Sequence, residues 1–354
     1  MIQAQATLVD PKIAIRPYEE GLEREWDEYV ERHPSSSPFH LIAWKRAVEK
    51  IFAFESRYLV AESHGGIRGV LPLFLVSNPI TGRALISTPF AVYGGICASD
   101  EQADSELRRA ACEMARAERV QYLELRERQH GSDSSFCVKH LYVTFDQELP
   151  PEPEQLLQGF PRDTRYMIRK GKKNGLYSVI DNRQLDDLYE IYAESVRQLG
   201  TPVFSKLWFR TLMKEFGERC EITVVRHQHR ALAAVLSFRF RDSILPYYGG
   251  SLGEGRHLAA NNFMYWEVMK RALESGVRRF DFGRSKLSTG SYMFKTQWNM
   301  RERALPYEFY LVRRTTLPNF SPLNSRFKPA IELWKHMPLP LTKVLGPALV
   351  RLFP

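Results

Sequence analysis

The residue types best suited to chemistry gather in one stretch, residues 278–299. Phe280-Asp281-Phe282 alternates apolar and polar positions as a half-buried strand does, and Gly283 ends it where an unusual turn is tolerated. A polar loop follows at 285–291, with Arg284 at its entrance. A strand end that presents a cation and small residues to a cleft suits the binding of an anion or a developing oxyanion. The alternative is an ordinary basic loop beside a hairpin.

The same stretch resembles a known family. Phe-Asp-Phe-Gly-Arg-Ser at 280–285, followed by Gly-Ser-Tyr-Met-Phe-Lys-Thr-Gln-Trp at 290–298, is similar to a motif of the FemAB acyltransferases. Upstream, Arg-Tyr-Met-Ile-Arg-Lys-Gly-Lys-Lys-Asn-Gly-Leu at 165–176 is similar to the basic helix of that family. Within the family, the closest match is the branch that accompanies PEP-CTERM/exosortase and exopolysaccharide loci. The resemblance implies tandem GNAT-like (GCN5-related acetyltransferase) domains and the transfer of an acyl or aminoacyl group.

The resemblance also implies roles for single residues. Lys295 matches the lysine of the family's Phe-Lys motif, and we expect it to stabilise charge in the transition state. Tyr292 and Arg284 are expected to orient substrate, with Ser285 beside them in the binding loop. Asp281 is either a general base or a structural carboxylate. We expect Lys295 to face a cleft between the domains, so that Lys295→Ala abolishes turnover and leaves the melting temperature nearly unchanged.

A strongly basic segment, residues 161–173, is predicted to form a helix. Its cations at spacing i, i+3, i+7 and i+10 share one side of that helix: Arg162, Arg165, Arg169 and Lys172, followed by Lys173. Like charges on one face repel one another, and a phosphate partner would offset this repulsion through charge-assisted contacts. The segment is therefore either a phosphate-binding wall within reach of Lys295 or a solvated helix face.

Length and composition set the broad class. The 354 residues are too many for one modest core and indicate two domains, and the formal charge of +9 indicates an anionic partner. No C-x-x-C pair, signal-peptide core or long apolar run is present. These features predict a cytoplasmic protein with reduced thiols, with peripheral contact at the inner membrane face left open.

An internal repeat predicts the fold. A hairpin, a Tyr-Gly-Gly strand, a helix and another strand occur twice, about 155 residues apart. Tyr93-Gly94-Gly95, expected in a strand at 90–97, recurs as Tyr248-Gly249-Gly250, and the strand at 121–126 recurs at 278–283. With the resemblance, this order predicts an α/β fold with mixed sheets, built as two tandem GNAT-like domains from an internal duplication.

The first domain is expected at residues 12–150 and the second, which carries the active site, at 151–315. The boundary is placed at Pro150-Pro151-Glu152-Pro153, after a strand at 141–145. Residues 327–354 form a tail of aliphatic and aromatic residues with a few cations, interrupted by prolines. The tail either packs on the domains or touches a membrane surface.

The acyl donor is left open between acyl-CoA and aminoacyl-tRNA, and no tightly bound cofactor is expected. GNAT enzymes hold the CoA pyrophosphate in an R/Q-x-x-G-x-G/A loop at a helix N-terminus. Arg256 fits this pattern, but Ala259 and Asn261 stand where glycines would be. Aminoacyl-tRNA, the donor common in the FemAB family, suits the basic charge. A metal site is not expected, because His227 and His229 stand in a predicted turn with no third ligand nearby.

These observations predict a transferase that modifies an amine or hydroxyl of a cell-envelope precursor, a peptidoglycan or exopolysaccharide intermediate. The enzyme would align the reactants and stabilise the tetrahedral oxyanion and the leaving group. Expected partners are a sugar or lipid-linked precursor and, for one donor, tRNA; no feature indicates an oligomeric state. The alternative is a non-catalytic GNAT-like module that binds a phosphorylated sugar or RNA.

Overall fold

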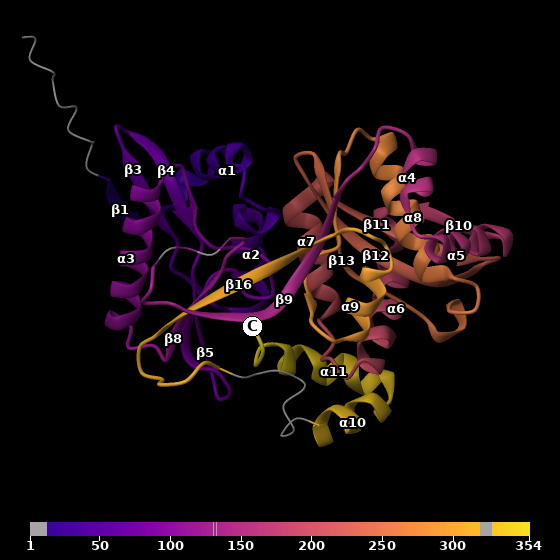
Figure 1. Ribbon diagram of the computed structural model, residues 1–354. Coiled ribbons are helices and arrows are strands. Elements are labelled where there is room, and N and C mark those ends of the chain that lie inside the picture. The colour runs from indigo at the N-terminus through magenta and orange to yellow at the C-terminus, as the bar shows by residue number, and fades with distance from the viewer. Residues whose placement is uncertain (1–12, 130, 132, 319–327) are drawn as a thin grey trace, which may run out of the picture.

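The computed structural model describes residues 13–129, 131, 133–318 and 328–354 (Figure 1). Residue 12 and Phe327, the predicted starts of the first domain and of the tail, lie outside these ranges. The N-terminal half contains β1 (Ala14–Pro17), α1 (Glu23–Arg32), α2 (Ile42–Phe52), β2 (Glu55–Ser56), β3 (Leu59–Ser63), β4 (Gly66–Leu71), β5 (Phe74–Asn78), β6 (Gly82–Ile86), β7 (Cys97–Ala98), α3 (Glu101–Ala117), β8 (Tyr122–Arg126) and β9 (Cys137–Glu148).

The C-terminal half contains α4 (Pro153–Gly159), α5 (Arg162–Lys173), β10 (Leu176–Ile180), α6 (Leu185–Gln198), α7 (Lys206–Phe216), β11 (Cys220–His227), β12 (Arg230–Phe240), β13 (Ser243–Ser251), α8 (Ala260–Glu274), β14 (Arg279–Asp281), β15 (Ser285–Lys286), α9 (Gly290–Thr296) and β16 (Arg301–Leu311). The tail consists of α10 (Lys328–His336) and α11 (Leu339–Val350).

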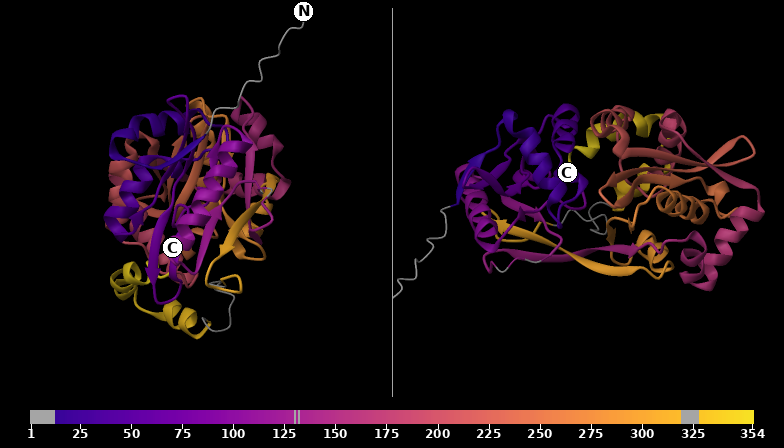
Figure 2. Two further views of the ribbon diagram at one scale, coloured as in Figure 1. Left: turned by 90° about the vertical axis from the view of Figure 1, so that its left-hand side faces the viewer. Right: turned by 90° about the horizontal axis from the view of Figure 1, so that it is seen from above.

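Two sheets organise these elements. The smaller has the order β1-β3-β4-β7 and is antiparallel throughout. The larger has the order β10-β11-β12-β13-β14-β9-β16-β8-β6-β5-β2, with β15 beside β9. It runs through both halves of the chain, and β9 and β16 are the two long strands that connect the halves in Figures 1 and 2.

The two halves repeat the same connection on either side of this central pair. Helix α3 leads into β8, which pairs in parallel with β6 and antiparallel with β16. Helix α8 leads into β14, which pairs in parallel with β13 and antiparallel with β9. Strands β8 and β14 thus hold equivalent positions, in agreement with the repeat of 121–126 at 278–283. The mixed α/β fold class is confirmed.

The predicted boundary after residue 150 does not separate the strands of the large sheet. β9, from the first segment, pairs with β14 of the second, with Glu148 opposite Arg279. β16, from the second segment, pairs with β8 of the first, with Tyr310 opposite Leu123. The halves therefore exchange their long strands, and each half depends on the other to complete its ladder.

Aromatic side chains fill the space between the halves. Trp44 on α2 and Trp208 on α7 are fully buried, with ring centroids 5.4 Å apart, and Phe39 packs on Tyr247 at 4.9 Å. Each half also has its own cluster of buried apolar side chains. One lies under α3 in the N-terminal half, and the other lies under α5 and α8 in the C-terminal half. Pulling the halves apart would expose the central cluster to water, which makes their separation unfavourable.

The predicted strand at 90–97 is wrong, because these residues form a loop that ends at β7. Gly94 has a φ of 150°, and a Cβ there would lie 1.7 Å from Thr88 Oγ1. The buried guanidinium of Arg126 donates to the carbonyls of Thr88 and Ala91 at 3.1 and 2.9 Å. These bonds satisfy backbone groups that a strand would pair in its ladder, so the loop is held without one.

Residues 290–296 form α9, where the hairpin alternative would place a second strand. The side chain of Thr289 caps this helix by accepting a hydrogen bond from the Tyr292 N–H. Trp298, just beyond the helix, is fully buried and anchors it to the core. Because Lys295 lies three residues before Trp298, the helix turns Lys295 inward as well.

One face of the tail packs on the domains, chiefly on α6. Trp334 Nε1 donates to the Thr201 carbonyl at 3.0 Å, and Lys343 pairs with Glu190. Beyond α11, Arg351 donates to the Phe52 carbonyl at 2.9 Å, so the tail contacts both halves. No helix within the described residues is long and apolar enough to cross a membrane.

Candidate functional site

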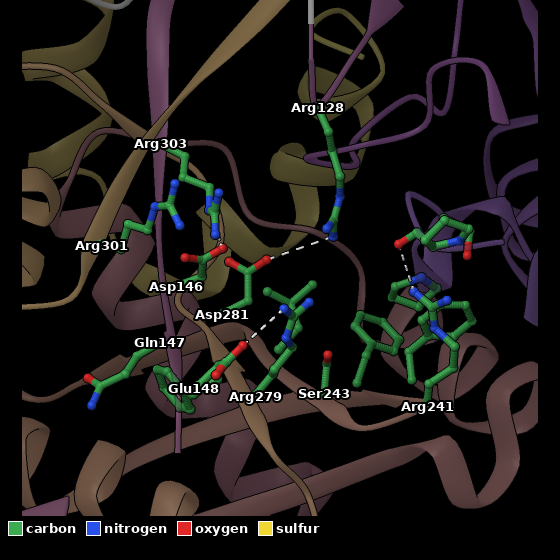
Figure 3. A pocket seen from close by; sticks show the side chains of 17 residues that line it. Arg128, Asp146, Gln147, Glu148, Arg241, Ser243, Arg279, Asp281, Arg301 and Arg303 are labelled. Atoms are coloured by element: carbon green, nitrogen blue, oxygen red, sulfur yellow. Dashed lines mark hydrogen bonds and ion pairs between the residues drawn. The ribbon is translucent and has the colours of Figure 1, made fainter. Parts of the chain in front are cut away.

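A cavity of about 260 Å³ lies between the halves, against β14 and the adjacent strands (Figure 3). Arginines from both halves line it: Arg128, Arg241, Arg279, Arg301 and Arg303. Three carboxylates share its walls: Asp146, Glu148 and Asp281. We call it the arginine-lined cavity. Cations outnumber carboxylates in its walls, so it attracts anions.

Strand alternation explains why these side chains meet. β14, β9 and β16 are neighbours, and their registers place Arg279 opposite Glu148, and both Asp281 and Arg301 opposite Asp146. Side chains two residues apart on a strand point to the same face. Each of the three strands therefore contributes two charged side chains to one face of the sheet, and that face is the floor of the cavity.

Asp281 is fixed at this floor by three donors. Its Oδ2 accepts a hydrogen bond of 2.7 Å from Tyr93 Oη, and its Oδ1 accepts from Thr144 Oγ1 and the Gly283 backbone N–H at 2.7 and 2.8 Å. Gly283 has a φ of 67°, and a Cβ there would lie 3.3 Å from Leu245. Glycine therefore suits the turn that aims its N–H at the carboxylate.

Arg128 enters the cavity from the N-terminal half, out of the loop after β8. Its guanidinium lies 3.9 Å from the Tyr93 ring centroid. Its Nη2 lies 3.9 Å from Asp281 Oδ2, as Figure 3 shows. Arg241 faces it from the turn between β12 and β13 and donates to the His33 carbonyl at 2.7 Å. Burial lowers the pKa of Arg241, and the nearby charge of Arg128 lowers it further, although Asp242 raises it. Two cations thus converge from opposite halves.

The cavity's remaining arginines differ in how they are paired. Arg303 Nε lies 2.6 Å from Asp146, and Arg279 Nη2 lies 3.3 Å from Glu148. The side chain of Arg301 is exposed and makes no hydrogen bond or ion pair with any described residue. A guanidinium has five N–H donors and suits the bidentate binding of phosphate or carboxylate. Arg301 and Arg128 are therefore the cations most available to a bound anion.

Lys295 does not face this cavity, so the predicted placement is wrong. Its side chain is buried, and Nζ donates to the carbonyls of Phe282, Gly283 and Arg284 at 2.7, 2.9 and 3.2 Å. Burial lowers the pKa of Lys295 to about 7, while Asp281 raises it and Arg284 lowers it. These bonds use all three donors of an ammonium group. Lys295 holds the turn that follows Asp281 and is a positioning residue in this structure.

Arg284 lies behind the cavity, among tyrosines of the domain interface. Its Nη1 donates to Tyr307 Oη at 2.9 Å, and its guanidinium lies 4.6 Å from the Tyr142 ring centroid. Burial lowers the pKa of Arg284, but the neighbouring tyrosines outweigh it and leave that pKa above its usual value. No carboxylate among the described residues pairs with Arg284. The positive charge of Arg284 is instead stabilised by the aromatic ring of Tyr142 and by the hydroxyl of Tyr307.

Ser285 and Tyr292 also lie away from the cavity. Ser285 is buried on β15 opposite Val143 of β9, and its hydroxyl has no hydrogen-bond partner within the described chain. Tyr292 Oη donates to Glu302 at 3.1 Å. Glu302 stands between two cavity arginines on β16, so strand alternation points it to the opposite face. Tyr292, which bonds to Glu302, therefore lies on the face of the sheet opposite the cavity.

The predicted basic helix is present as α5, but it takes no part in the cavity. It packs on α8 through Gly171, and Thr164 Oγ1 donates to the Gln297 carbonyl beside α9 at 2.6 Å. Its cations point outward: Arg162, Arg169, Lys172 and Lys173 are exposed, and Arg165 is half-buried. The expected wall shared with Lys295 is not formed, because α9 turns Lys295 toward the sheet.

Arg256 is exposed in the loop between β13 and α8, also outside the cavity. In that loop Ala259 adopts a φ of 64°, a conformation that favours glycine, at the N-terminus of α8. A Cβ on Gly255 would lie 2.9 Å from the Ala260 Cβ. The loop therefore holds Ala259 in a glycine-like conformation at the start of α8, although Ala259 and Asn261 replace the glycines of the pattern.

Comparisons with known proteins agree with this architecture. Residues 159–296, from α5 to α9, match a family model described as an acetyltransferase (GNAT) domain. The crystal structure of FemX is similar with a TM-score of 0.65, covering 91% of this chain and 100% of that one at 16% identity. The chain has a tandem GNAT fold, which it shares with FemX. The resemblance to FemAB is thereby confirmed for the fold, and the exopolysaccharide branch stays a prediction.

Two further solved structures share this tandem GNAT fold. One is the C-terminal domain of a protein described as a lysylphosphatidylglycerol synthetase from Agrobacterium fabrum, with a TM-score of 0.57 and 13% identity over 81% of this chain and 91% of that one. The other is a tandem GNAT protein from the clavulanic acid biosynthesis pathway, with a TM-score of 0.52 and 12% identity over 84% and 98%. No curated protein matches the sequence.

Of the site residues predicted from the sequence, Asp281 is the one that lines the cavity. The missed arginines left partial signals. Arg128 lies two residues after β8, as Gly283 lies two residues after β14, and Arg301 and Arg303 are two residues apart, as side chains on one face of a strand are. These signals could have marked charged positions, but the pairing of β9 and β16 across the halves carries no local signature.

Proposed function

We propose that the protein is an acyl- or aminoacyl-transferase whose acceptor carries an anionic group held in the arginine-lined cavity. One observation carries this proposal: the cavity lies between two GNAT-fold halves and has Asp281, from the FemAB-like motif, at its floor. A concave site with convergent polar groups, shared by two structural units, is a favourable place for a small molecule.

Arg128 and Arg301 are the proposed anion-binding residues. Arg128 reaches in from the N-terminal half, and Arg301, which has no partner among the described residues, reaches in from β16. Arg279 and Arg303 are held by carboxylates and keep the floor ordered. Charge-assisted contacts from two sides would fix the orientation of a phosphate and, with it, the acceptor's nucleophile.

The proposed reaction is acyl transfer to an amine or hydroxyl. A bond forms between the acceptor nitrogen or oxygen and the acyl carbon, and the donor's thioester or ester bond breaks. The proton of the acceptor leaves with the departing thiol or hydroxyl. Asp281 accepts three hydrogen bonds in the structure, so we assign it the orientation of Tyr93 and of the Gly283 turn, with no role as general base.

The proposed acceptor is a cell-envelope precursor, either a peptidoglycan or exopolysaccharide sugar or a lipid-linked intermediate. The name of one structural neighbour, a lysylphosphatidylglycerol synthetase, includes an aminoacylated lipid, and FemX shares the fold over nearly the whole chain. Phosphate groups are common to nucleotide-linked and lipid-linked sugars, and they are what the cavity arginines would bind.

The two candidate acyl donors, acyl-CoA and aminoacyl-tRNA, would bind to different surfaces of the protein. The loop before α8, with Arg256, would receive the pyrophosphate of an acyl-CoA. The outward cations of α5, with the exposed ring of Tyr166 on the same helix, would suit the backbone of an aminoacyl-tRNA. Neither surface lies in the arginine-lined cavity, so the donor and the acceptor would approach from different sides.

A non-catalytic binding module remains the second candidate, and one observation favours it. Lys295, the motif residue expected at the oxyanion, uses its three donors on backbone carbonyls. A protein that had lost transfer activity would still bind the anion in its arginine-lined cavity.

The test combines binding and product analysis on the full chain. Pyrophosphate binding is measured by calorimetry for the wild type, for the double variant Arg128→Ala/Arg301→Ala, and for Arg183→Ala. Arg183 is an exposed arginine that pairs with Asp181 outside the cavity lining, and it serves as the control. We expect the double variant to weaken binding by about tenfold or more, since hydrogen bonds to charged groups contribute roughly 1.5–3 kcal/mol each, and the control to bind like the wild type.

Transfer is then assayed by mass spectrometry with acetyl-CoA or a charged tRNA mixture as donor and an amino-sugar nucleotide as acceptor. A product formed by the wild type and reduced in the double variant supports the proposal. Pyrophosphate binding with no product from any donor, together with unchanged envelope glycans in a deletion strain, would favour the binding module. Equal pyrophosphate binding by wild type and double variant would remove the cavity from the proposal.

A further inference from the structure

Helix α11 exposes three of its larger aliphatic side chains along one face, while Leu339, Leu349 and Val350 pack on the protein. Its outward stripe lies at spacing i, i+3, i+4 and i+7: Leu341, Val344, Leu345 and Ala348. Val344 is 74% exposed and Leu341 48%. The side chains it buries are those of Thr342 and Val350, next to Gly346. A helix that only packed on the protein would present polar side chains on its outward face.

This orientation is fixed by contacts on the inner face. Lys343, the single charged residue within α11, pairs with Glu190 on α6. Gly346 lies against the backbone of Val203, where a Cβ would approach the carbonyl oxygen to 2.4 Å. Rotating the helix to bury the stripe would break the ion pair and press a larger side chain into this close contact. The aliphatic stripe is therefore held in solvent by the fold.

Positive charge borders the stripe. Arg351, just past α11, is exposed and continues the stripe at i+10 from Leu341. On α10, Leu333 is 67% exposed and is followed by the exposed His336, and Lys328 is exposed at the helix start. Residues 328–354 contain four lysines and arginines against the single carboxylate Glu332. Figures 1 and 2 show both helices at the edge of the molecule, outside the two sheets.

The size of the stripe argues against a second copy of the chain as its occupant. Twelve helical residues span about 18 Å and a helix is about 10 Å wide, so the stripe offers roughly 180 Å². A stable protein interface buries about 800 Å² on each partner. A bilayer has no such requirement, because a few aliphatic side chains can enter the headgroup boundary while cations contact anionic lipids.

We propose that α11, together with Leu333 of α10, is the face by which the protein binds an anionic lipid bilayer. Leu341, Val344 and Leu345 enter the boundary between headgroups and acyl chains, and Arg351, which donates one hydrogen bond to the Phe52 carbonyl, presents its remaining N–H donors to lipid phosphates. This inference concerns location and holds whether or not the acyl transfer proposed above occurs.

Vesicle flotation of the full chain tests this inference. We expect the wild type to float with vesicles of equal parts phosphatidylglycerol and phosphatidylcholine, and much less with phosphatidylcholine alone. Added salt should weaken the binding, because it screens the headgroup attraction. Val344→Glu/Leu345→Glu should lower vesicle affinity by about tenfold or more, since two side chains lose their apolar burial. The milder Val344→Ala/Leu345→Ala, which keeps helix propensity, should lower it in the same direction.

Ile180→Glu is the matched control, because Ile180 is an exposed aliphatic residue on β10, away from the tail. It should float like the wild type, and melting temperatures of all variants should stay close together. Equal flotation of wild type and both tail variants would overturn the proposal. So would a dimer, seen by light scattering, that the Glu variant dissociates, since the stripe would then be covered by a second copy.

Discussion

Tyr93 Oη donates a hydrogen bond of 2.7 Å to Asp281 Oδ2 and so joins two residues 188 positions apart in the chain. The same carboxylate accepts from Thr144 and from the Gly283 N–H, while Arg128 lies over the face of the Tyr93 ring. Burial raises the pKa of Tyr93 well above its usual value, so the hydroxyl keeps its proton at neutral pH. The hydrogen bond from Tyr93 to Asp281 thus joins the two halves and also fixes a carboxylate at the floor of the arginine-lined cavity.

Tyr93→Phe should lower both stability and activity. The ring and its packing remain, but Asp281 loses one of its three donors, and a lost hydrogen bond to a charged group costs about 1.5–3 kcal/mol. Urea unfolding followed by fluorescence should show a loss of that size. Tyr292→Phe removes a hydroxyl that bonds to Glu302 outside the cavity, and it should change stability by less than about 0.5 kcal/mol. Equal losses in the two variants would contradict the structure.

Lys295→Met should destabilise the protein, which reverses the expectation from the sequence. Methionine keeps the length of the side chain but leaves the carbonyls of Phe282, Gly283 and Arg284 without their donor. Leaving buried acceptors unsatisfied costs about 1–3 kcal/mol. The melting temperature should therefore fall together with activity. Lys214→Met, at an exposed position on α7, should change neither.

The pH dependence of stability should change in the same variant. Burial lowers the pKa of Lys295 in the folded protein to about 7, whereas the ordinary pKa of lysine is 10.5. Between these values the unfolded chain binds more protons, so Lys295 makes the free energy of unfolding rise with pH, by up to about 1.4 kcal/mol per unit. Lys295→Met should show a smaller rise between pH 7 and 10 in urea titrations. An identical slope in variant and wild type would mean that this lysine titrates alike in both states.

Residues 151–354 should not fold alone. Without β9, strands β14 and β16 lose their shared neighbour, and the aromatic cluster around Trp208 loses Trp44 and its surroundings. Thermal unfolding of this fragment by circular dichroism should lack a cooperative transition. Co-expression with residues 1–150 is the control and should restore it. A cooperative transition in the isolated fragment would support the contiguous domains predicted from the sequence.

Most helices were predictable because their signal is local. Trp26, Tyr29 and Val30 lie at helical spacing in the sequence and are the buried residues of α1. The equivalent positions of β8 and β14 followed from the repeat of 121–126 at 278–283. Strand partners in the centre of the sheet were not predictable, because nothing in the neighbourhood of β9 specifies β14 and β16 as its neighbours.

The candidate site shows the same division between local and long-range information. Asp281 was identified because its strand and the following glycine are adjacent in sequence. Apart from Arg279 on the same strand, the arginines around it come from a loop, a turn and strand β16, which meet only in the fold. For Lys295, the motif indicated a constrained lysine, but whether its ammonium reaches a cleft depends on the orientation of α9.

The last prediction separates the two proposed donors through helix α5. Arg169 and Lys172 are exposed there, three residues apart. If the donor is an aminoacyl-tRNA, Arg169→Glu/Lys172→Glu should raise the KM for the donor by about tenfold or more, because two phosphate contacts become repulsive. It should also flatten the salt dependence of binding by about 0.7–0.9 in the log–log slope for each lost contact. With an acyl-CoA donor, neither quantity should change.

The control for this experiment carries the same charge change on another helix. Arg210 and Lys214 are exposed on α7, one turn apart, and Arg210→Glu/Lys214→Glu changes the net charge of the protein by the same amount. If both double variants raise the KM equally, the effect is a general consequence of net charge, and α5 is not the donor surface. If the α5 variant alone does so while kcat stays constant, the basic helix binds the donor and leaves the chemistry at the arginine-lined cavity untouched.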